Sequence, residues 1–189
     1  MLSGRILVVA FEGWNDATEA ASGAVKAIAE QIQAMTIDAV DPEDYYDFQF
    51  SRPMLELDED GNRTLSWPGT ELMQASKEQI AKIPALDDLY LLIGTEPSRR
   101  WLSFAGEVLE MVQDREIDYV IMLGAMLADV PHTRPMQVFR SSQNPALREL
   151  FDLEPSRYEG PVGILTVLSQ AFEAEGIPVL SLWGSVPHY

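Results

Sequence analysis

The sequence predicts an α/β protein, a three-layer α/β/α sandwich with a mostly parallel central sheet. Four short apolar runs have the composition of strands that are covered on both faces. Stretches with helical periodicity separate these runs, and such alternation is typical of a layered α/β fold. The runs are residues 5–11, 89–94, 119–123 and 179–183. We therefore expect a single α/β domain over residues 1–189.

The first strand leads into a helix. Residues 5–11 form the strand, and residues 17–35 are rich in alanine, with an apolar stripe at helical spacing. Asn15 or Asp16 can cap this helix, because a short polar side chain accepts hydrogen bonds from the first free N–H groups. Residues 36–40 then predict a short strand.

The next segment departs from the alternation. Residues 41–52 are acidic and aromatic, which favours an exposed excursion. Residues 53–67 predict a β-hairpin insertion, with Asp60-Gly61 as its turn. The pattern over residues 70–82 is weak and favours a helix or a loop with helical character. Residues 84–95 carry the next core strand.

The second half of the chain returns to strands and helices. Residues 101–115 show the spacing of a helix with one buried face, and Ser98 is a suitable cap. We expect Gly160-Pro161 to open a later helix, because proline is favoured at the first helical position. The other expected elements are strands at 118–124, 136–141 and 177–183 and helices at 144–151 and 160–175.

Composition limits the classes of partner. The formal net charge of −17 argues against a nucleic-acid surface and against an anionic membrane surface, since both attract basic proteins. The charge favours either plain solubility or attraction to a basic partner. The sequence has neither an apolar run long enough for a membrane span nor a signal-peptide pattern, so we expect a cytoplasmic protein. The absence of cysteine excludes disulfides, thiolate metal sites and a cysteine nucleophile.

Polar turns follow the apolar runs, and the carboxyl ends of parallel strands meet at one edge of a sheet. The turn Gly13-Trp14-Asn15-Asp16 lies between a strand and a helix. It is either a helix N-terminus that offers N–H groups to an anion or a partner, or a structural turn with a tryptophan packed over the sheet edge. Neither nucleotide-binding fingerprint, GxGxxG or GxxxxGKS/T, occurs in the chain.

The sharpest local motif is Pro131-His132-Thr133-Arg134-Pro135, in which two prolines hold a short loop extended. An imidazole, a hydroxyl and a guanidinium lie between them. This set can bind an anion, or transfer a proton if a carboxylate orients His132. Asp129 and Glu96 are the candidates for that carboxylate. The alternative is a rigid loop in which Arg134 makes an internal ion pair.

His188 stands at the end of another strand, where it can converge on His132 across the sheet. Two histidines and a carboxylate would suffice for a metal site, but the chain lacks the HxH and HExxH spacings. We therefore expect no metal. No serine lies in a GxSxG motif, which argues against a serine hydrolase.

The acidic and aromatic stretch at residues 44–48 suggests a surface that contacts proteins, because exposed aromatic side chains flanked by charge are typical of interfaces. The alternative is a lid packed on its own domain. The expected partner contacts are Tyr45, Tyr46, Phe48 and Arg52.

Taken together, these motifs resemble the proteasome assembly chaperone family, in its bacterial branch from actinobacteria-like organisms. Each motif is weak alone, but their order and spacing are specific and cover nearly the whole chain. Some members of the family carry an ATP-grasp superfamily label, and the sequence shows no ATP-grasp nucleotide site. The resemblance runs through residues 13–17, 20–21, 44–49, 51–53, 94–97, 100–101, 123–126, 131–135, 158–161, 181–183 and 186–189.

The resemblance implies a three-layer fold of the phosphorylase- or hydrolase-like kind, similar to purine nucleoside phosphorylases. Eukaryotic members pair and scaffold the assembly of the proteasome α-ring. The family has no agreed catalytic residues, so none is carried over to this chain. Similar bacterial members continue into a C-terminal helical segment, and we expect such a segment to follow residue 189.

Two functions remain open. The first, which we favour, is a non-enzymatic assembly factor or scaffold: a homo-oligomer without a cofactor that binds proteins such as proteasome subunits. The second is a small-molecule-binding protein or an enzyme, for a nucleoside- or phosphate-type ligand or of a carboxylate–amine ligase-like kind. Its candidate catalytic residues are His132, Arg134 and Glu96. Its ligand-binding residues would be Trp14, Asn15, Asp16, Glu96, Arg100, His132, Thr133, Arg134 and His188.

Overall fold

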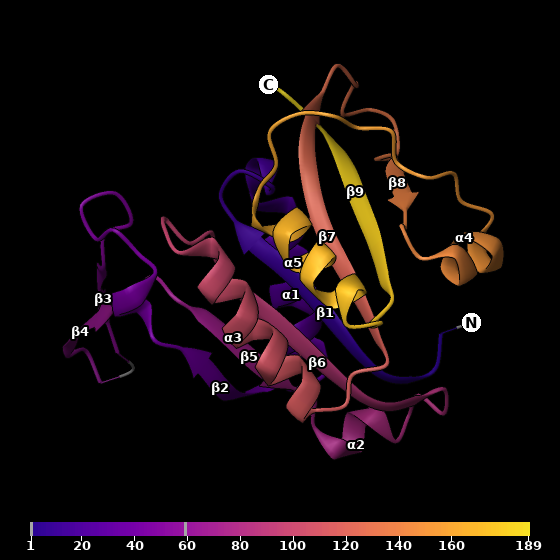
Figure 1. Cartoon of the computed structure of the whole chain (residues 1–189). Coiled ribbons are helices and arrows are strands. Elements are labelled where there is room, and N and C mark those ends of the chain that lie inside the picture. The colour runs from indigo at the N-terminus through magenta and orange to yellow at the C-terminus, as the bar shows by residue number, and fades with distance from the viewer. Residues whose placement is uncertain (1, 59) are drawn as a thin grey trace.

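A central sheet organises the chain. The structure is a computed structural model that describes residues 2–58 and 60–189. Seven strands form the sheet in the order β2-β5-β6-β1-β7-β9-β8 (Figure 1). The four inner strands are parallel: β6 (Leu86–Thr95), β1 (Gly4–Glu12), β7 (Tyr119–Ala128) and β9 (Val179–Pro187). The outer strands pair antiparallel: β2 (Met35–Val40), β5 (Thr70–Gln74) and β8 (Val138–Ser141). The mostly parallel sheet is confirmed.

Helices cover both faces of this sheet. Successive side chains of a strand point to opposite faces, so Leu7 and Phe11 enter one core while Val8 enters the other. The first core is closed by α3 (Trp101–Asp114) and α5 (Ile164–Ala174), and the second by α1 (Ala20–Gln31). Figure 1 shows α3 and α5 on the near face and α1 behind the sheet. The three-layer sandwich is therefore confirmed.

Two short helices, α2 (Lys77–Ile80) and α4 (Pro145–Phe151), lie outside these layers. Asn144 caps α4 as expected, because its side chain accepts hydrogen bonds from the main-chain N–H groups of Ala146 and Leu147. The helical prediction for residues 70–82 is wrong in its first half. That half is strand β5, which pairs with β6 and buries Leu72. In the described part of the chain, no helix is both long and apolar enough to cross a membrane.

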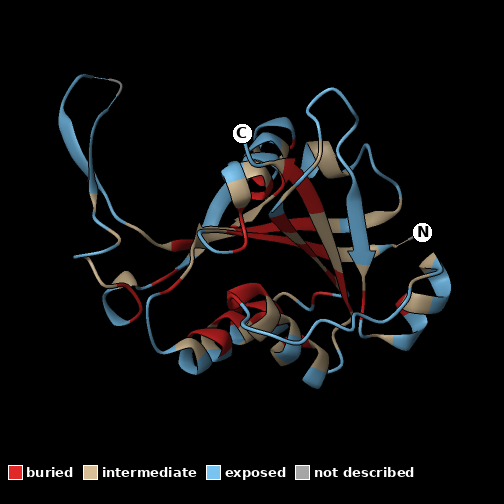
Figure 2. Ribbon diagram, turned by 90° about the horizontal axis from the view of Figure 1, so that it is seen from above, coloured by how far each residue is buried: buried red, intermediate tan, exposed pale blue. Residues whose placement is uncertain are grey.

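The predicted hairpin is confirmed. Strands β3 (Met54–Leu57) and β4 (Arg63–Ser66) pair only with each other, as a separate two-stranded sheet. The turn between them places Gly61 at a φ of 81°, a left-handed conformation that glycine adopts without strain. We call residues 53–67 the arm, of which residue 59 lies outside the described residues. Figure 2 shows the arm projecting from the body, exposed along its length.

Several boundaries differ from those expected, and two of them affect the site. Strands β7 and β9 continue to Ala128 and Pro187, four residues past their predicted ends. Helix α5 begins at Ile164 and not at Gly160, whose φ of 156° is not helical. Ser98 does not cap α3; its hydroxyl accepts a hydrogen bond from the N–H of Asp47 instead.

Candidate functional site

The turn after β1 is built around two buried polar side chains. Its main chain bridges to β7, because the N–H of Ala125 donates to the carbonyl of Asn15 (2.8 Å). The Asp16 carboxylate accepts hydrogen bonds from the N–H groups of Ala21 (2.7 Å) and Ser22 (3.2 Å) at the start of α1. Asp16 is therefore a capping residue, as the sequence allowed, and its carboxylate is engaged within the fold. Trp14 projects outward and is 72% exposed.

Glu96 joins this turn to α5. The main-chain N–H of Ile164 donates to Glu96 Oε1 (2.8 Å), so a carboxylate from the end of β6 stabilises the positive end of the α5 dipole. Asn15 lies beside this contact, and its Oδ1 has no hydrogen-bond partner among the described residues. Gly163 makes the close approach possible, because a Cβ there would lie 2.8 Å from Glu96 Oε1 and closer still to Asn15 Oδ1. The predicted convergence of strand ends thus holds for Asn15 and Glu96.

The two histidines form a separate cluster at the far ends of β7 and β9. His132 Nδ1 lies 3.2 Å from the hydroxyl of Tyr189, and the rings of both histidines pack edge-to-face against the Tyr189 ring. His188 Nδ1 lies 3.3 Å from Asp129 Oδ1. One carboxylate expected to orient His132 thus contacts His188, and the other, Glu96, is bound to α5. The geometry does not assemble the predicted proton-transfer pair.

Arg100 and Arg134, which were expected in the ligand site, do not contact Asn15 or Glu96 among the described interactions. Arg100 pairs with Asp44 (2.5 Å) and lies over the ring of Tyr45, with 5.6 Å from its Cζ to the ring centroid. Arg134 and Thr133 lie in an exposed turn, in which the N–H of Arg134 donates to the carbonyl of Pro131 (3.1 Å). No group of three or more potential metal ligands occurs within residues 2–58 and 60–189.

The prediction that the aromatic residues of 44–48 form an exposed contact surface is wrong. Tyr45 and Tyr46 are buried, and Phe48 packs against the same core. Tyr45 donates its hydroxyl hydrogen to Glu107 (2.6 Å). The segment is a lid on its own domain, which was the alternative reading. Of the expected partner contacts, only Arg52 is exposed.

An unpredicted residue, Arg99, holds this segment in place. Its guanidinium donates to the main-chain carbonyls of Glu43 (3.0 Å), Asp44 (3.4 Å) and Tyr46 (3.1 Å). These carbonyls are satisfied by a side chain that can make several directed hydrogen bonds at once. The sequence shows two adjacent arginines, Arg99 and Arg100, ahead of α3. It does not reveal which of the two points inward and holds the segment.

Burial of Tyr46 predicts a pH dependence of stability. Its hydroxyl contacts Thr70 Oγ1 (2.9 Å) and donates to the carbonyl of Thr95 (2.8 Å). Desolvation raises the pKa of Tyr46 to about 12, above the value of about 10 for an unfolded tyrosine. A raised folded-state pKa stabilises the fold fully below the unfolded pKa, and this contribution is lost as the pH rises from about 10 through about 12.

We therefore expect the free energy of unfolding to fall across this alkaline range, by up to about 1.4 kcal/mol per pH unit from this group. Urea unfolding of the wild type and of Tyr46→Phe at several pH values measures it. The variant should show the smaller fall, and equal slopes for the two proteins would contradict the assignment.

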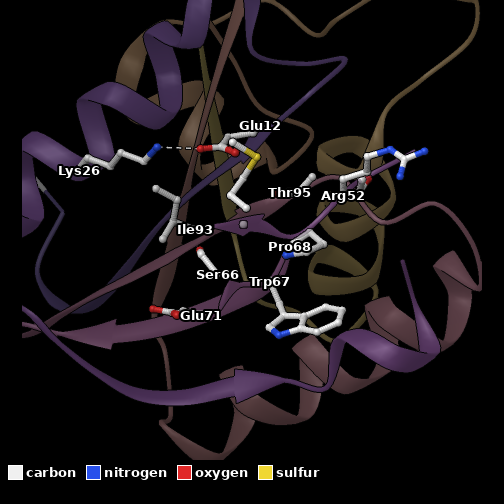
Figure 3. A pocket seen from close by; sticks show the side chains of 13 residues that line it. Glu12, Lys26, Arg52, Ser66, Trp67, Pro68, Glu71, Ile93 and Thr95 are labelled. Carbon is white, nitrogen blue, oxygen red and sulfur yellow. Dashed lines mark hydrogen bonds and ion pairs between the residues drawn. The ribbon is translucent and has the colours of Figure 1, made fainter. Parts of the chain in front are cut away.

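A groove that the sequence did not predict lies where the arm leaves the body. It has a volume of about 480 Å³ and an open mouth. Glu12 and Lys26 form an ion pair in its wall (2.7 Å), while Trp67 and Arg52 come from the arm side (Figure 3). The hydrogen bond to Glu12 raises the pKa of Lys26. Its lining residues do not include those of the histidine loop.

Exposed apolar side chains gather where the parallel strands end. Trp14 precedes Asn15, whose carbonyl binds Ala125, and residues 126 and 127 continue β7 from that point. The loop before α5 carries Tyr158 and Val162 and ends at Gly163, which approaches Asn15. We call this set the strand-end surface: Trp14, Met126, Leu127, Tyr158 and Val162.

Comparison with known proteins assigns the family. Residues 10–189 match the family model described as PAC2 family. The chain belongs to the PAC2 family. The match covers the strands of the central sheet except residues 4–9 of β1, and it includes the strand-end surface. The PAC2 fold therefore accounts for the sheet, both helical layers and the residues at the strand ends.

Solved structures of similar proteins agree with this PAC2 assignment. A PAC2 family protein from Streptomyces avermitilis is 41% identical, with a TM-score of 0.85 over 98% of this chain and 77% of its own. A proteasome-assembly chaperone homologue from Mycobacterium tuberculosis is 40% identical, with a TM-score of 0.84 over 97% of this chain and 76% of its own. PbaA of Pyrococcus furiosus, an archaeal homolog of proteasome-assembly chaperone, shares the fold at 17% identity, with a TM-score of 0.66 over 98% and 73% of the two chains. No curated protein matches this chain.

Proposed function

We propose that this PAC2 protein is a non-enzymatic assembly factor that binds other proteins through its strand-end surface. The observation that carries the proposal is the exposure of large apolar side chains at the edge where α/β proteins usually bind their ligands. Exposed apolar residues that gather in one place mark interaction sites more often than scattered ones do. Trp14 and Leu127 are each at least 60% exposed there.

The contacts of the polar residues support binding over catalysis. Glu96 caps α5, Asp16 caps α1, and Asp129 contacts His188. Catalysis requires a base held within hydrogen-bond reach of its target and oriented by a partner. Here the carboxylates that would orient His132 have other partners. Aromatic side chains such as Trp14 are frequent energetic centres of protein interfaces.

Proteasome subunits are the proposed partners. Two structural relatives, those from M. tuberculosis and P. furiosus, are described as homologues of a proteasome-assembly chaperone. The acidic chain, with a net charge of −17, would be attracted to basic regions of such a partner. The proposal includes self-association of this chain into a homo-oligomer, which sedimentation velocity would measure.

The test is native mass spectrometry and pull-down with purified proteasome α subunits of the same organism. We expect a complex, and we expect Trp14→Ser with Leu127→Ser to weaken it about tenfold, because central aromatic contacts contribute most of the binding energy. Met35→Ser is the matched control, since Met35 is equally exposed (73%) but starts β2 at the opposite edge of the sheet. Absence of any complex at tens of micromolar would overturn the proposal.

A further inference from the structure

The arm has two chemically different faces. In the register of β3 with β4, Leu55 is opposite Leu65 and Leu57 is opposite Arg63. Because side chains alternate between the faces of a strand, these four residues share one face. Met54, Glu56, Thr64 and Ser66 occupy the other face. We call Leu55, Leu57 and Leu65 the leucine face.

The leucine face is open to solvent. Leu55 is 51%, Leu65 56% and Leu57 71% exposed. The contact of the arm with the body is at its base, where the Trp67 ring packs edge-to-face on Phe48, with 4.9 Å between their centroids. A two-stranded hairpin alone is marginally stable in water. Three aligned leucines on such a hairpin add nothing to the core of this chain, so they are available to another surface.

The tip of the arm is acidic. Asp58 and Asp60 lie in the turn, and Glu56 precedes them on β3. The Asp58 carboxylate accepts hydrogen bonds from the N–H groups of Asp60 (3.0 Å) and Asn62 (2.7 Å), which lower the pKa of Asp58 and keep it charged. Complementary charge guides partners together and excludes surfaces of like charge. An acidic tip on a chain with a net charge of −17 therefore disfavours a second copy of this chain and an anionic membrane as its occupant.

We propose that the leucine face of the arm inserts into an apolar groove, bordered by lysines or arginines, on the partner protein. This inference rests on the proposed function. It adds to the strand-end surface a second, separate contact surface on the arm. The leucines supply the buried contact, and the acidic tip pairs with the basic border. Figure 2 shows the arm projecting from the body, and the three leucines of its leucine face are exposed.

Binding of the purified α subunits by biolayer interferometry tests the inference. Leu55→Ser with Leu57→Ser and Leu65→Ser should raise the dissociation constant about tenfold or more. Met54→Ser with Thr64→Ala, on the opposite face, should change it by less than about twofold. Thermal unfolding of both variants should match that of the wild type, because the arm lies outside the core. Added salt and Glu56→Gln with Asp60→Asn should both slow association if the groove has a basic border.

The outcomes separate the two proposals. If the wild type binds and the leucine variant binds equally well, this inference fails and the proposed function stands. If the wild type binds no α subunit, the proposed function fails and this inference fails with it. A homodimer that the leucine variant abolishes, or binding to phosphatidylcholine vesicles that it abolishes, would replace the proposed occupant and overturn the inference. Insensitivity of association to salt and to the acidic-tip variant would overturn the basic border.

Discussion

Replacing Phe104 by alanine should lower the free energy of unfolding by about 3–5 kcal/mol, the range measured for large aromatic residues removed from protein cores. Phe104 is fully buried in α3. Its ring packs edge-to-face between Phe11 of β1 (5.8 Å between centroids) and Tyr45 of the lid (5.3 Å). The substitution would leave a cavity between the sheet, the helix and the lid at once, so no single element could relax to fill it.

Urea denaturation followed by circular dichroism measures this effect. Leu102→Ala is the control, because Leu102 belongs to the same helix but is 86% exposed. Its effect should stay within about 0.5 kcal/mol, as for most surface substitutions. If Phe104→Ala cost as little as Leu102→Ala, the lid would not be packed on α3 as the structure shows.

Gly163→Ala should lower the free energy of unfolding by about 3 kcal/mol, which combines overpacking with the weakening of a hydrogen bond to a charged group. A Cβ at Gly163 would overlap the side-chain amide of Asn15 and lie 2.8 Å from Glu96 Oε1. Both groups are fixed, Asn15 through its carbonyl bond to β7 and Glu96 through Ile164. Helix α5 would have to move away from the strand ends.

The matched control is Gly23→Ala in α1, where an added Cβ meets nothing within 4 Å. Alanine is favoured over glycine inside a helix, so this variant should gain about 0.5–1 kcal/mol. Opposite signs for the two substitutions in thermal unfolding would support the close approach at Gly163. A neutral or stabilising Gly163→Ala would show that α5 does not approach Asn15 this closely.

The parallel core of the fold was predictable because its strands are buried on both faces. Residues 5–11, 89–94, 119–123 and 179–183 carry apolar side chains at nearly every position, as strands that are covered on both faces require. Residues 70–74 were misassigned because β5 lies toward an edge of the sheet and is only five residues long. In so short a strand, with Thr70 and Leu72 buried and only Glu71 exposed, the sequence pattern has no clear period.

The candidate site was predictable only in part. The rule that parallel strands end at one edge placed Asn15 and Glu96 together correctly. The same rule did not predict that His132 and His188 lie in a separate cluster. Their position depends on the extra length of β7 and β9 beyond β1, and this length depends on pairing between segments that are distant in the sequence. The burial of Tyr45 was missed because its acidic neighbours suggest exposure. The segment is held on the body by Arg99, which is distant in the sequence and binds its main-chain carbonyls. Gly163 gave no signal, since a close approach involves residues from three separate elements.

The close approach of Gly163 to Asn15 and Glu96 has a consequence for the binding of a partner protein. The Asn15 carbonyl fixes the turn after β1 to β7, the N–H of Glu96 donates to the carbonyl of Glu12 at the end of β1, and the Glu96 carboxylate binds the first turn of α5. Trp14 therefore stands on a rigid base, and a partner would restrict little more than the rotamers of the side chains it touches. Such preorganisation reduces the entropy lost on association, so that modest contact area can give useful affinity.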